Sequence, residues 1–477
     1  MEKIVLAESD RQLPRAVRGI SRVLGACLVV WAGLDDPWVG GGPGFGMTQG
    51  GLLVIGSVLV GSSFLGETWN TRALMVVLSV GFVLVTAEIA ARVLFSARYK
   101  PPYRLDERTL YTLVPGAVRE HELRPVNGGK RILYRINRDG FRGDELVEQP
   151  RLRVAVYGDS FIQAEFSPLE ETFAEQLEQH LARRLGDGVE VVNAGVAGFG
   201  PDQALRKMEA ELDSLAPEIL VMGVFAGNDF GDPIRNKLFR LDDEGELVEN
   251  DFRLGPEQRR ALLVRNQELV LKRVVRDALR ATGARLGLFA LPASELEGMS
   301  AVEKVEFFFA QRVREYQEFV VEGDDEVIEL AWDSYDADVS LEPEADSSRY
   351  KVGLMKAVLA RMQRLADERG ILFVLLPIPH PIDVGGHPTG EVDRAAHPDY
   401  RPRGLVSLLE GIAGELGIPV VDLYTPFSVE GSQMLYFTGG DDHWNAKGQD
   451  LGAEIVADFL MSGGEGSENL MNQVLSP

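Results

Sequence analysis

Three long apolar stretches lie within the first hundred residues, at positions 19–34, 50–65 and 73–95. The third is long enough to cross about 30 Å of hydrocarbon, and Glu88 is its one acidic interruption. The second carries no charge but is near the short limit for a membrane span, and Arg22 interrupts the first. We therefore predict a membrane region over residues 1–100 with about three transmembrane helices. The alternative is a hairpin that packs on a core or on a membrane surface.

Basic residues beside these stretches predict an orientation, because Lys and Arg are retained on the inner side of a membrane. Four arginines precede or begin the first stretch, whereas Asp35 and Asp36 follow it. This favours an inner N-terminus and, after three spans, a body beyond residue 100 on the extracytoplasmic (periplasmic) side. Four basic residues near the end of the third stretch oppose this orientation: Arg92, Arg98, Lys100 and Arg104.

From residue 151 onward, short apolar runs alternate with helical patterns. Runs rich in β-branched residues predict buried strands at 152–157, 189–192, 219–225, 371–376 and 418–423. Apolar residues at three- and four-residue spacing predict helices at 170–185, 202–215, 352–370, 403–416 and 446–461. This alternation predicts an α/β fold of three layers, in which a parallel sheet lies between helices as in flavodoxin-like proteins.

The remaining segments interrupt or flank that pattern. Residues 101–150 are expected to be a connector with some β structure, including a strand at 132–136. Residues 231–351 are charged and mostly helical in pattern, with a long candidate helix near 256–282, and we interpret them as an insertion or cap. The α/β domain would then comprise residues 151–230 and 352–465, followed by a flexible tail at 466–477.

Charge narrows the choice of partners. The net charge is −24, but the first hundred residues hold nine basic and seven acidic groups, so the rest carries about −26. Such an acidic body is a poor partner for nucleic acid, whose affinity depends on neutralised phosphates. It also disfavours a polyanionic glycan.

The single cysteine, Cys27, excludes an intrachain disulfide. The sequence Leu24-Gly25-Ala26-Cys27 is like a lipoprotein cleavage box. However, Arg22 interrupts the apolar run that such a signal needs. We therefore interpret these residues as a small-residue patch in a membrane helix.

Polar and glycine-rich groups follow the ends of the predicted strands. Ligands bind beyond the carboxyl ends of the strands in open parallel sheets, so these groups are expected to meet at one edge. They are Gly158-Asp159-Ser160, then Gly195, Gly198 and Gly200, then Gly227-Asn228-Asp229, and finally Asp441-Asp442-His443.

These residue types suit acyl transfer. The Ser160 hydroxyl is a weak nucleophile until a base removes its proton, and His443 is suited to that role near neutral pH. A carboxylate, for which Asp441 is the candidate, orients the imidazole and stabilises its cation. The backbone N–H groups of Ser160 and Gly198 and the side-chain amide of Asn228 are candidate donors to the developing oxyanion.

Four blocks of sequence, in this order, resemble the SGNH (GDSL-type) hydrolase superfamily. They are Tyr157-Gly158-Asp159-Ser160-Phe161, Asn193-Ala194-Gly195-Val196-Ala197-Gly198, Gly227-Asn228-Asp229 and Asp441-Asp442-His443-Trp444-Asn445. The resemblance covers about 151–230 and 352–460. Each block alone is a weak signal, but four blocks at matching strand ends are strong evidence.

One position departs from the family pattern. The family usually has its acid three residues before the histidine, where this chain has Gly440. The acid must therefore be Asp441 or Asp442. A spacing of two residues resembles a subset that includes polysaccharide O-acetyltransferases. Because neighbouring side chains of an extended segment point oppositely, only one of the two should face the site, and Asp441 is in phase with His443.

Structural roles compete with the catalytic ones. Ser160 alone would be interpreted as a helix N-cap, and Asn228 and His443 as loop or helix-start residues. His380 ends a predicted strand at the active edge and is a candidate for substrate contact, although a loop histidine with satisfied hydrogen bonds is commoner. Asp229 is a second such candidate, but we favour a role within its own loop. The remaining histidines show no metal-ligand spacing, and no phosphate-binding glycine loop is present, so we expect neither metal nor cofactor.

Three functions remain open. The first is a membrane-anchored hydrolase that removes acetyl or other acyl groups from a glycan or a lipid. The second is an O-acyltransferase that modifies a cell-envelope polysaccharide and takes its acyl group from a membrane-bound donor protein. The third is a catalytically silent envelope scaffold, which the intact set of catalytic residues does not favour.

Overall fold

The computed structural model describes residues 2–34, 47–95, 102–123, 125–250, 301–323, 334–439 and 441–462, with short pieces between 254 and 300. The chain divides into two compact units. The N-terminal unit comprises Met1–Lys100 and Arg259–Leu291, and the C-terminal unit comprises Pro101–Gln258 and Pro292–Pro477. Most of the helix expected near 256–282, and all of the tail expected at 466–477, lie outside the described residues.

The N-terminal unit contains three helices: α1 (Glu2–Gly33), α2 (Met47–Ser62) and α3 (Glu67–Leu94). Two stretches are long and apolar enough to cross a membrane, Arg15–Gly33 in α1 and Glu67–Leu94 in α3, whereas Gln49–Ser62 in α2 is shorter. Two of the three stretches expected as transmembrane helices, the first and the third, thus have the length and composition of a membrane span.

Glycines bring α1 and α2 together. A Cβ atom on Gly25 would lie 2.7 Å from the carbonyl oxygen of Gly56, and a Cβ on Gly56 would lie 2.7 Å from the oxygen of Gly25. Small residues permit such close approach of backbones in helix pairs that lack a hydrophobic driving force. Gly25 belongs to the small-residue patch that contains the exposed Cys27.

Glu88, the acidic interruption of α3, accepts hydrogen bonds within the same unit. Its carboxylate receives the backbone N–H groups of Val270 and Leu271, at 3.1 and 2.8 Å, and also binds Arg92 Nε at 2.6 Å. Val270 also packs against Ala91. A piece of the predicted insertion thus belongs to the N-terminal unit.

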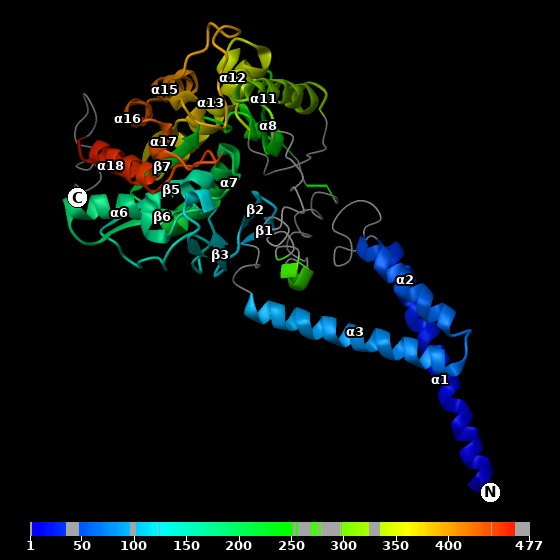
Figure 1. Ribbon diagram of the computed structural model, residues 1–477. Helices are drawn as coiled ribbons and strands as arrows, with labels where there is room; N and C mark the ends of the chain where they lie inside the picture. The colour runs from blue at the N-terminus through cyan, green and yellow to red at the C-terminus, as the bar shows by residue number, and fades with distance from the viewer. Residues whose placement is uncertain are drawn as a thin grey trace. The chain divides into compact units, whose positions relative to one another are not determined.

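The C-terminal unit is built on a four-stranded parallel sheet in the order β10-β7-β5-β6 (Figure 1). The strands are β5 (Leu152–Tyr157), β6 (Val189–Asn193), β7 (Ile219–Phe225) and β10 (Leu372–Ile378). The register pairs Val154 with both Val191 and Ile219, and Leu375 with Met222. Nearly every residue of β5, β7 and β10 is buried, as expected of a parallel sheet covered on both faces.

Helices cover both faces of this sheet, so the predicted α/β fold is confirmed. Phe173, Leu177 and Leu181 of α6 (Phe173–Leu185) and Val456 of α18 (Ala446–Ser462) share one core with alternate residues of the strands. The other helices that pack around the sheet are α7 (Pro201–Leu215), α13 (Asp346–Asp367) and α15 (Gly404–Leu416). This arrangement places the residues that follow the strands at one edge of the sheet.

The strand expected at 418–423 does not form. Its one bridge to the sheet joins Val420 to Leu375, whose N–H donates to Pro419 O at 2.9 Å and whose carbonyl accepts from Val421 N at 3.0 Å. The ladder stops on both sides because the next donors would be Pro377 and Pro419, which have no N–H. An apolar, β-branched run therefore reaches the sheet but cannot extend along it.

The connector has more β structure than expected. It contains two antiparallel pairs, formed by β1 (Tyr103–Asp106), β2 (Leu110–Leu113), β3 (Val118–Glu122) and β4 (Arg131–Arg135). The described helices of the insertion are α8 (Asp232–Asn236), α11 (Ala301–Tyr316), a short π-helix at Gln317–Val321 and α12 (Ala337–Leu341). Its described strands form one hairpin, β8 (Phe239–Leu241) and β9 (Leu247–Glu249). Three short helices complete the unit: α14 (Pro381–Val384), α16 (Tyr424–Glu430) and α17 (Ser432–Leu435).

Candidate active site

Ser160 begins a four-residue helix, α5 (Ser160–Gln163), directly after β5. The N-cap of α5 is Asp159, whose side chain accepts from Phe161 N at 2.9 Å, so Ser160 does not have the capping role considered for it. Gly158 is required here, because a Cβ would lie 2.6 Å from Ile162 Cγ1 and 2.9 Å from Gly223 O. The turn therefore presents the serine at the carboxyl end of a central strand.

The glycine block is bonded to this turn. Asn193 Nδ2 donates to Ile162 O at 2.7 Å, and Val196 N donates to Gly158 O at 3.0 Å. A Cβ on Gly195 would lie 2.5 Å from Gln163 N, so only glycine permits this approach. Gly198 has a φ of +75°, a left-handed conformation that glycine adopts without strain.

The asparagine block folds as a loop after β7. Asn228 is buried and its Nδ2 donates to Asp232 Oδ2 at 3.1 Å. Asp229 Oδ2 accepts from the backbone N–H of Phe225 at 2.7 Å. Burial is the main cause that raises the pKa of the Asp229 carboxyl, and repulsion from Asp159 and Asp232 raises it further. Asp229 thus has a partner within its own loop.

His443 lies against the turn over residues 158–163 that carries the candidate nucleophile Ser160, which we call the nucleophile turn. Its ring stacks on that of Phe161 at a centroid distance of 4.9 Å, and the adjacent Trp444 donates from Nε1 to Phe161 O at 3.0 Å. Phe161 also stacks on Phe225 of β7, at 4.0 Å. His443 Nε2 is buried and has no hydrogen-bond partner among the described residues, Ser160 included.

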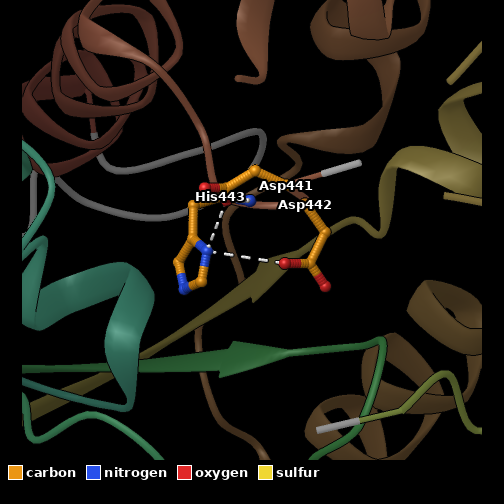
Figure 2. A group of neighbouring side chains, drawn as sticks. All are labelled: Asp441, Asp442 and His443. Atoms are coloured by element: carbon orange, nitrogen blue, oxygen red, sulfur yellow. Dashed lines mark hydrogen bonds and ion pairs between the residues drawn. The ribbon is translucent and has the colours of Figure 1, made fainter. Parts of the chain in front are cut away.

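Both acidic neighbours of His443 approach the same ring nitrogen (Figure 2). His443 Nδ1 is 2.9 Å from Asp441 Oδ1 and 3.4 Å from Asp442 Oδ1. The expectation that only one carboxylate faces the histidine is therefore wrong. The segment is not an extended strand: Asp441 Oδ1 also accepts from His443 N at 3.2 Å, and the chain bends at His443, so side chains do not alternate.

His380 joins this cluster from the end of β10. Its Nε2 is 3.6 Å from Asp442 Oδ2, and its Nδ1 accepts from Ile382 N at 3.1 Å. A Cβ on Gly227 would lie 2.3 Å from His380 Cδ2, so the asparagine block packs directly on this ring. The four blocks are thus linked by contacts.

The carboxylates set the charge of this cluster. Burial lowers the pKa of His443, but the Asp441 hydrogen bond and the Asp442 and Asp441 charges outweigh it, so the pKa rises above its ordinary value. Burial alone would raise the pKa of Asp442, but His380 and His443 bring it to about 2. Burial lowers the pKa of His380 despite Asp442. The arrangement therefore stabilises an imidazolium at His443.

The same donors also have the spacing of a metal site. The ligand atoms of Asp441, Asp442 and His443 all lie within 4.8 Å of one another. Two carboxylates and an imidazole can coordinate a divalent cation as well as form an ion pair. Removal of divalent cations with a chelator therefore distinguishes a metal site from an ion pair at these residues.

Sequence reasoning missed Arg142, a residue of the connector that contacts the chain just after Ser160. This arginine is buried, and its guanidinium donates to the carbonyl oxygens of Gln163 and Ala164, and to Ser167 O at 2.5 Å. It thereby satisfies carbonyls at the end of α5 that have no partner within so short a helix. Because its partners lie more than twenty residues away, no spacing rule identifies it.

The insertion supports the asparagine block in a similar way. Asp336 Oδ2 accepts from Phe230 N and Gly231 N, each at 3.0 Å, and Asp336 N donates to Gly227 O at 2.5 Å. Arg312 of α11 forms an ion pair with Asp336 at 3.1 Å, and both side chains are fully buried. This clamp, formed by Arg312 and Asp336, fixes the backbone on either side of Asn228.

The model of the GDSL-like lipase/acylhydrolase family matches residues 156–451, which is more than half of the chain. The chain belongs to this family. It is therefore a hydrolase that acts on ester bonds. No curated protein matches the sequence.

Several solved structures match the chain at low identity. A lipase/acylhydrolase from Enterococcus faecalis is 12% identical, with 65% of this chain and 95% of that chain covered and a TM-score of 0.31. The esterase EstA from Pseudoalteromonas sp. is 13% identical, with 64% and 94% covered and a TM-score of 0.31. An acetyl xylan esterase, AlAXEase, is 12% identical, with 66% and 100% covered and a TM-score of 0.31.

Proposed function

We propose that this family member is a membrane-anchored serine esterase that removes acetyl or other acyl groups from a glycan or lipid of the cell envelope. In this proposal Ser160 is the nucleophile, His443 the general base and Asp441 the orienting acid. The observation that carries it is the placement of His443, which stacks beside the nucleophile turn with Asp441 on Nδ1. Nε2, on the opposite side of the ring, is then available to exchange a proton.

The proposed reaction has two steps. Ser160 Oγ attacks the acyl carbon while its proton passes to His443 Nε2, and Asp441 and Asp442 stabilise the imidazolium. The oxyanion accepts hydrogen bonds from the N–H groups of Ser160 and Gly198 and from the Asn228 amide. His443 then protonates the departing alcohol, and a water molecule, activated in the same way, hydrolyses the acyl-serine.

The membrane anchor is the second part of the proposal. The apolar helices α1 and α3 are long enough to span a bilayer and α2 is shorter, which supports an anchor with two or three spans. The arginines before the first span favour an inner N-terminus, so an anchor of three spans would have the C-terminal unit on the extracytoplasmic side.

Acyl transfer to a sugar hydroxyl is the second candidate. It is favoured by the pairing of His443 with an acid two residues earlier, at 2.9 Å, in place of an acid at position 440. This spacing resembles the polysaccharide O-acetyltransferase subset. In this version a glycan hydroxyl replaces water in the second step, and a membrane-bound protein supplies the acyl group.

Covalent labelling tests the serine centre. The full-length chain in detergent is treated with a fluorophosphonate, and mass spectrometry locates the adduct. We expect labelling of Ser160 that disappears in Ser160→Ala and His443→Ala but persists in Ser428→Ala, an exposed serine outside the site. A folded protein that is labelled elsewhere or not at all would contradict the assignment.

Two further measurements distinguish the remaining alternatives. Hydrolysis of p-nitrophenyl acetate should persist in EDTA if the Asp441, Asp442 and His443 cluster holds a proton rather than a metal ion. Addition of a soluble oligosaccharide should leave the rate of acetate release unchanged for an esterase. For a transferase, acetylated oligosaccharide should accumulate at the expense of acetate.

A further inference from the structure

A large cleft lies beside the catalytic cluster, in the segment that follows β10. Its volume is about 1180 Å³, and it is bounded by residues 382–402 together with groups from α11, α16 and α17. Ligand pockets for small molecules typically occupy about 300–1,000 Å³. The cleft is therefore large enough for an oligomeric ligand and much larger than an acetyl ester needs.

Two paths of close contacts connect the walls of this cleft to the segment Asp442–His443, and one of them consists of hydrogen bonds throughout. Ile382 N donates to His380 Nδ1 at 3.1 Å, and His380 Nε2 is 3.6 Å from Asp442. His387, another wall residue, bonds from Nε2 to Phe437 O at 2.9 Å, and Phe437 N donates to His443 O at 2.8 Å. A ligand in the cleft would thus lie next to the segment that carries the proposed base.

The deep wall of the cleft is polar. Asp383 is 3% exposed, and its Oδ1 accepts from Tyr335 Oη at 2.6 Å and from Tyr400 Oη at 2.8 Å. Its Oδ2 has no hydrogen-bond partner among the described residues. A buried polar atom without a hydrogen-bond partner lowers the stability of the fold. A ligand hydroxyl or a water molecule that enters through the cleft would supply that hydrogen bond.

The outer part of the cleft mixes charged, aromatic and apolar groups. Glu391 and Arg394 of the lining are exposed, Tyr424 is half-buried, and Val302 and Val392 add apolar surface. The guanidinium of Arg403 lies 5.2 Å from the centroid of the Tyr424 ring, so only the other face of that ring is open to a ligand. Hydrogen-bonding groups interleaved with a ring face match a sugar, which presents hydroxyls at its edges and C–H groups on its faces.

We propose that this cleft binds the sugar units of an uncharged oligosaccharide that carries the ester cleaved at Ser160. The proposal rests on the proposed function. A fatty acyl chain fits the cleft poorly, because it would cover Asp383 without supplying a hydrogen bond. A polyanionic glycan fits it poorly as well, because Asp383, Glu391 and Asp393 outnumber Arg394.

Substitutions at the rim separate sugar binding from chemistry. Glu391→Gln and Tyr424→Ala are introduced into the full-length protein in detergent, with Glu244→Gln in the β8–β9 turn as the matched surface control. Hydrolysis is measured with p-nitrophenyl acetate, which carries no sugar unit to occupy the cleft, and with acetylated xylo-oligosaccharide. We expect both rim variants to lose at least tenfold in kcat/KM on the oligosaccharide and to change less than twofold on p-nitrophenyl acetate.

Direct binding tests the cleft independently of the esterase assignment. Titration calorimetry with unacetylated xylopentaose, mannopentaose and chitopentaose uses Ser160→Ala, which removes the nucleophile and leaves the cleft unchanged. We expect at least one of these sugars to bind, and the rim substitutions to weaken its Kd at least tenfold. The cleft assignment is overturned if none binds, if the rim variants bind equally well, or if they impair p-nitrophenyl octanoate instead. An inactive wild-type protein that still binds sugar through the rim would contradict only the proposed function.

Discussion

The two carboxylates at His443 have different surroundings. Asp441 is the closer of the two to Nδ1 and also accepts the backbone N–H of His443, so it fixes the orientation of the ring. Asp442 is farther from Nδ1 and is shared with His380. We infer that Asp441 positions the imidazole and that Asp442 mainly adds charge.

Substitution of each acid should therefore have a different signature. Asp441→Asn should reduce kcat by about 10²–10⁴, because the ring loses its orienting partner. Asp442→Asn should have a smaller effect on the maximal rate, but should move the acidic limb of the pH–rate profile by about one unit toward lower pH. The sign follows because His443 must be neutral to act as a base, and removal of a negative charge lowers its raised pKa.

The measurement is kcat/KM for p-nitrophenyl acetate from acidic to alkaline pH, corrected for spontaneous hydrolysis. Identical pH profiles for the wild type and Asp442→Asn would refute the division of roles.

Strands and helices formed where the sequence pattern predicts them when their formation depends on the residues of the segment itself. The runs at 152–157 and 219–225 became β5 and β7 with the expected bounds, since a fully buried parallel strand is a continuous apolar run. The run at 418–423 has the same pattern but does not form a strand. Strand pairing also depends on N–H donors in the neighbouring strand, where Pro377 supplies none.

The candidate site was foreseeable only in part, for a similar reason. Ser160 and His443 stand in short motifs, and strand order brings such motifs to one edge of the sheet. Arg142, Arg312 and Asp336 are single residues whose partners lie far along the chain. Nothing in their sequence neighbourhood distinguishes them from surface charges.

The clamp of Arg312 and Asp336 should control the asparagine block. Asp336→Asn keeps the shape of the side chain but weakens the hydrogen bonds that it accepts from Phe230 N and Gly231 N. Asn228 should then lose its fixed position. We expect kcat to fall by about 10–10²-fold with little change in KM, which is less than the loss of an oxyanion donor itself. Asp243→Asn, at an exposed turn, is the control. A fall in thermal stability with unchanged kcat would indicate a purely structural clamp.

Arg142 should contribute mainly to stability. Arg142→Met retains the aliphatic bulk but leaves the buried carbonyls of Gln163 and Ser167 without a donor, and that of Ala164 with only the Ser167 N–H, which should cost about 2–5 kcal/mol. Arg138→Met, in the neighbouring exposed turn, should change the free energy of unfolding by about 0.5 kcal/mol or less. Urea denaturation followed by tryptophan fluorescence compares the two, and equal midpoints would exclude the proposed support.

At the scale of the whole molecule, the chain combines an apolar N-terminal unit with a strongly acidic C-terminal unit. Residues 259–291, with eight basic and two acidic groups, belong to the N-terminal unit, so the C-terminal unit carries a net charge of about −32. This charge favours solubility of the C-terminal unit and repels anionic lipid headgroups. An anchored enzyme of this composition is held to the membrane by its helices, and the surface of its C-terminal unit adds little attraction.

The orientation is testable with two reporters at the C-terminus. Alkaline phosphatase is active only outside the cytoplasm, and green fluorescent protein exported in unfolded form fluoresces only inside. We expect an active phosphatase fusion and a dark fluorescent fusion, with the protein resistant to extraction by alkaline carbonate. The reverse pattern would place the C-terminal unit inside and indicate an even number of spans.

The two prolines that shorten the sheet have a consequence for copies of the protein on one membrane. An open sheet edge can pair with the edge of another molecule, and anchoring concentrates molecules in two dimensions. Here the outermost position beside β10 is occupied by a segment that pairs at a single bridge, so it offers a neighbour no regular row of donors and acceptors. In a chain anchored as proposed, Pro377 and Pro419 would therefore protect this edge of the sheet against strand-by-strand association.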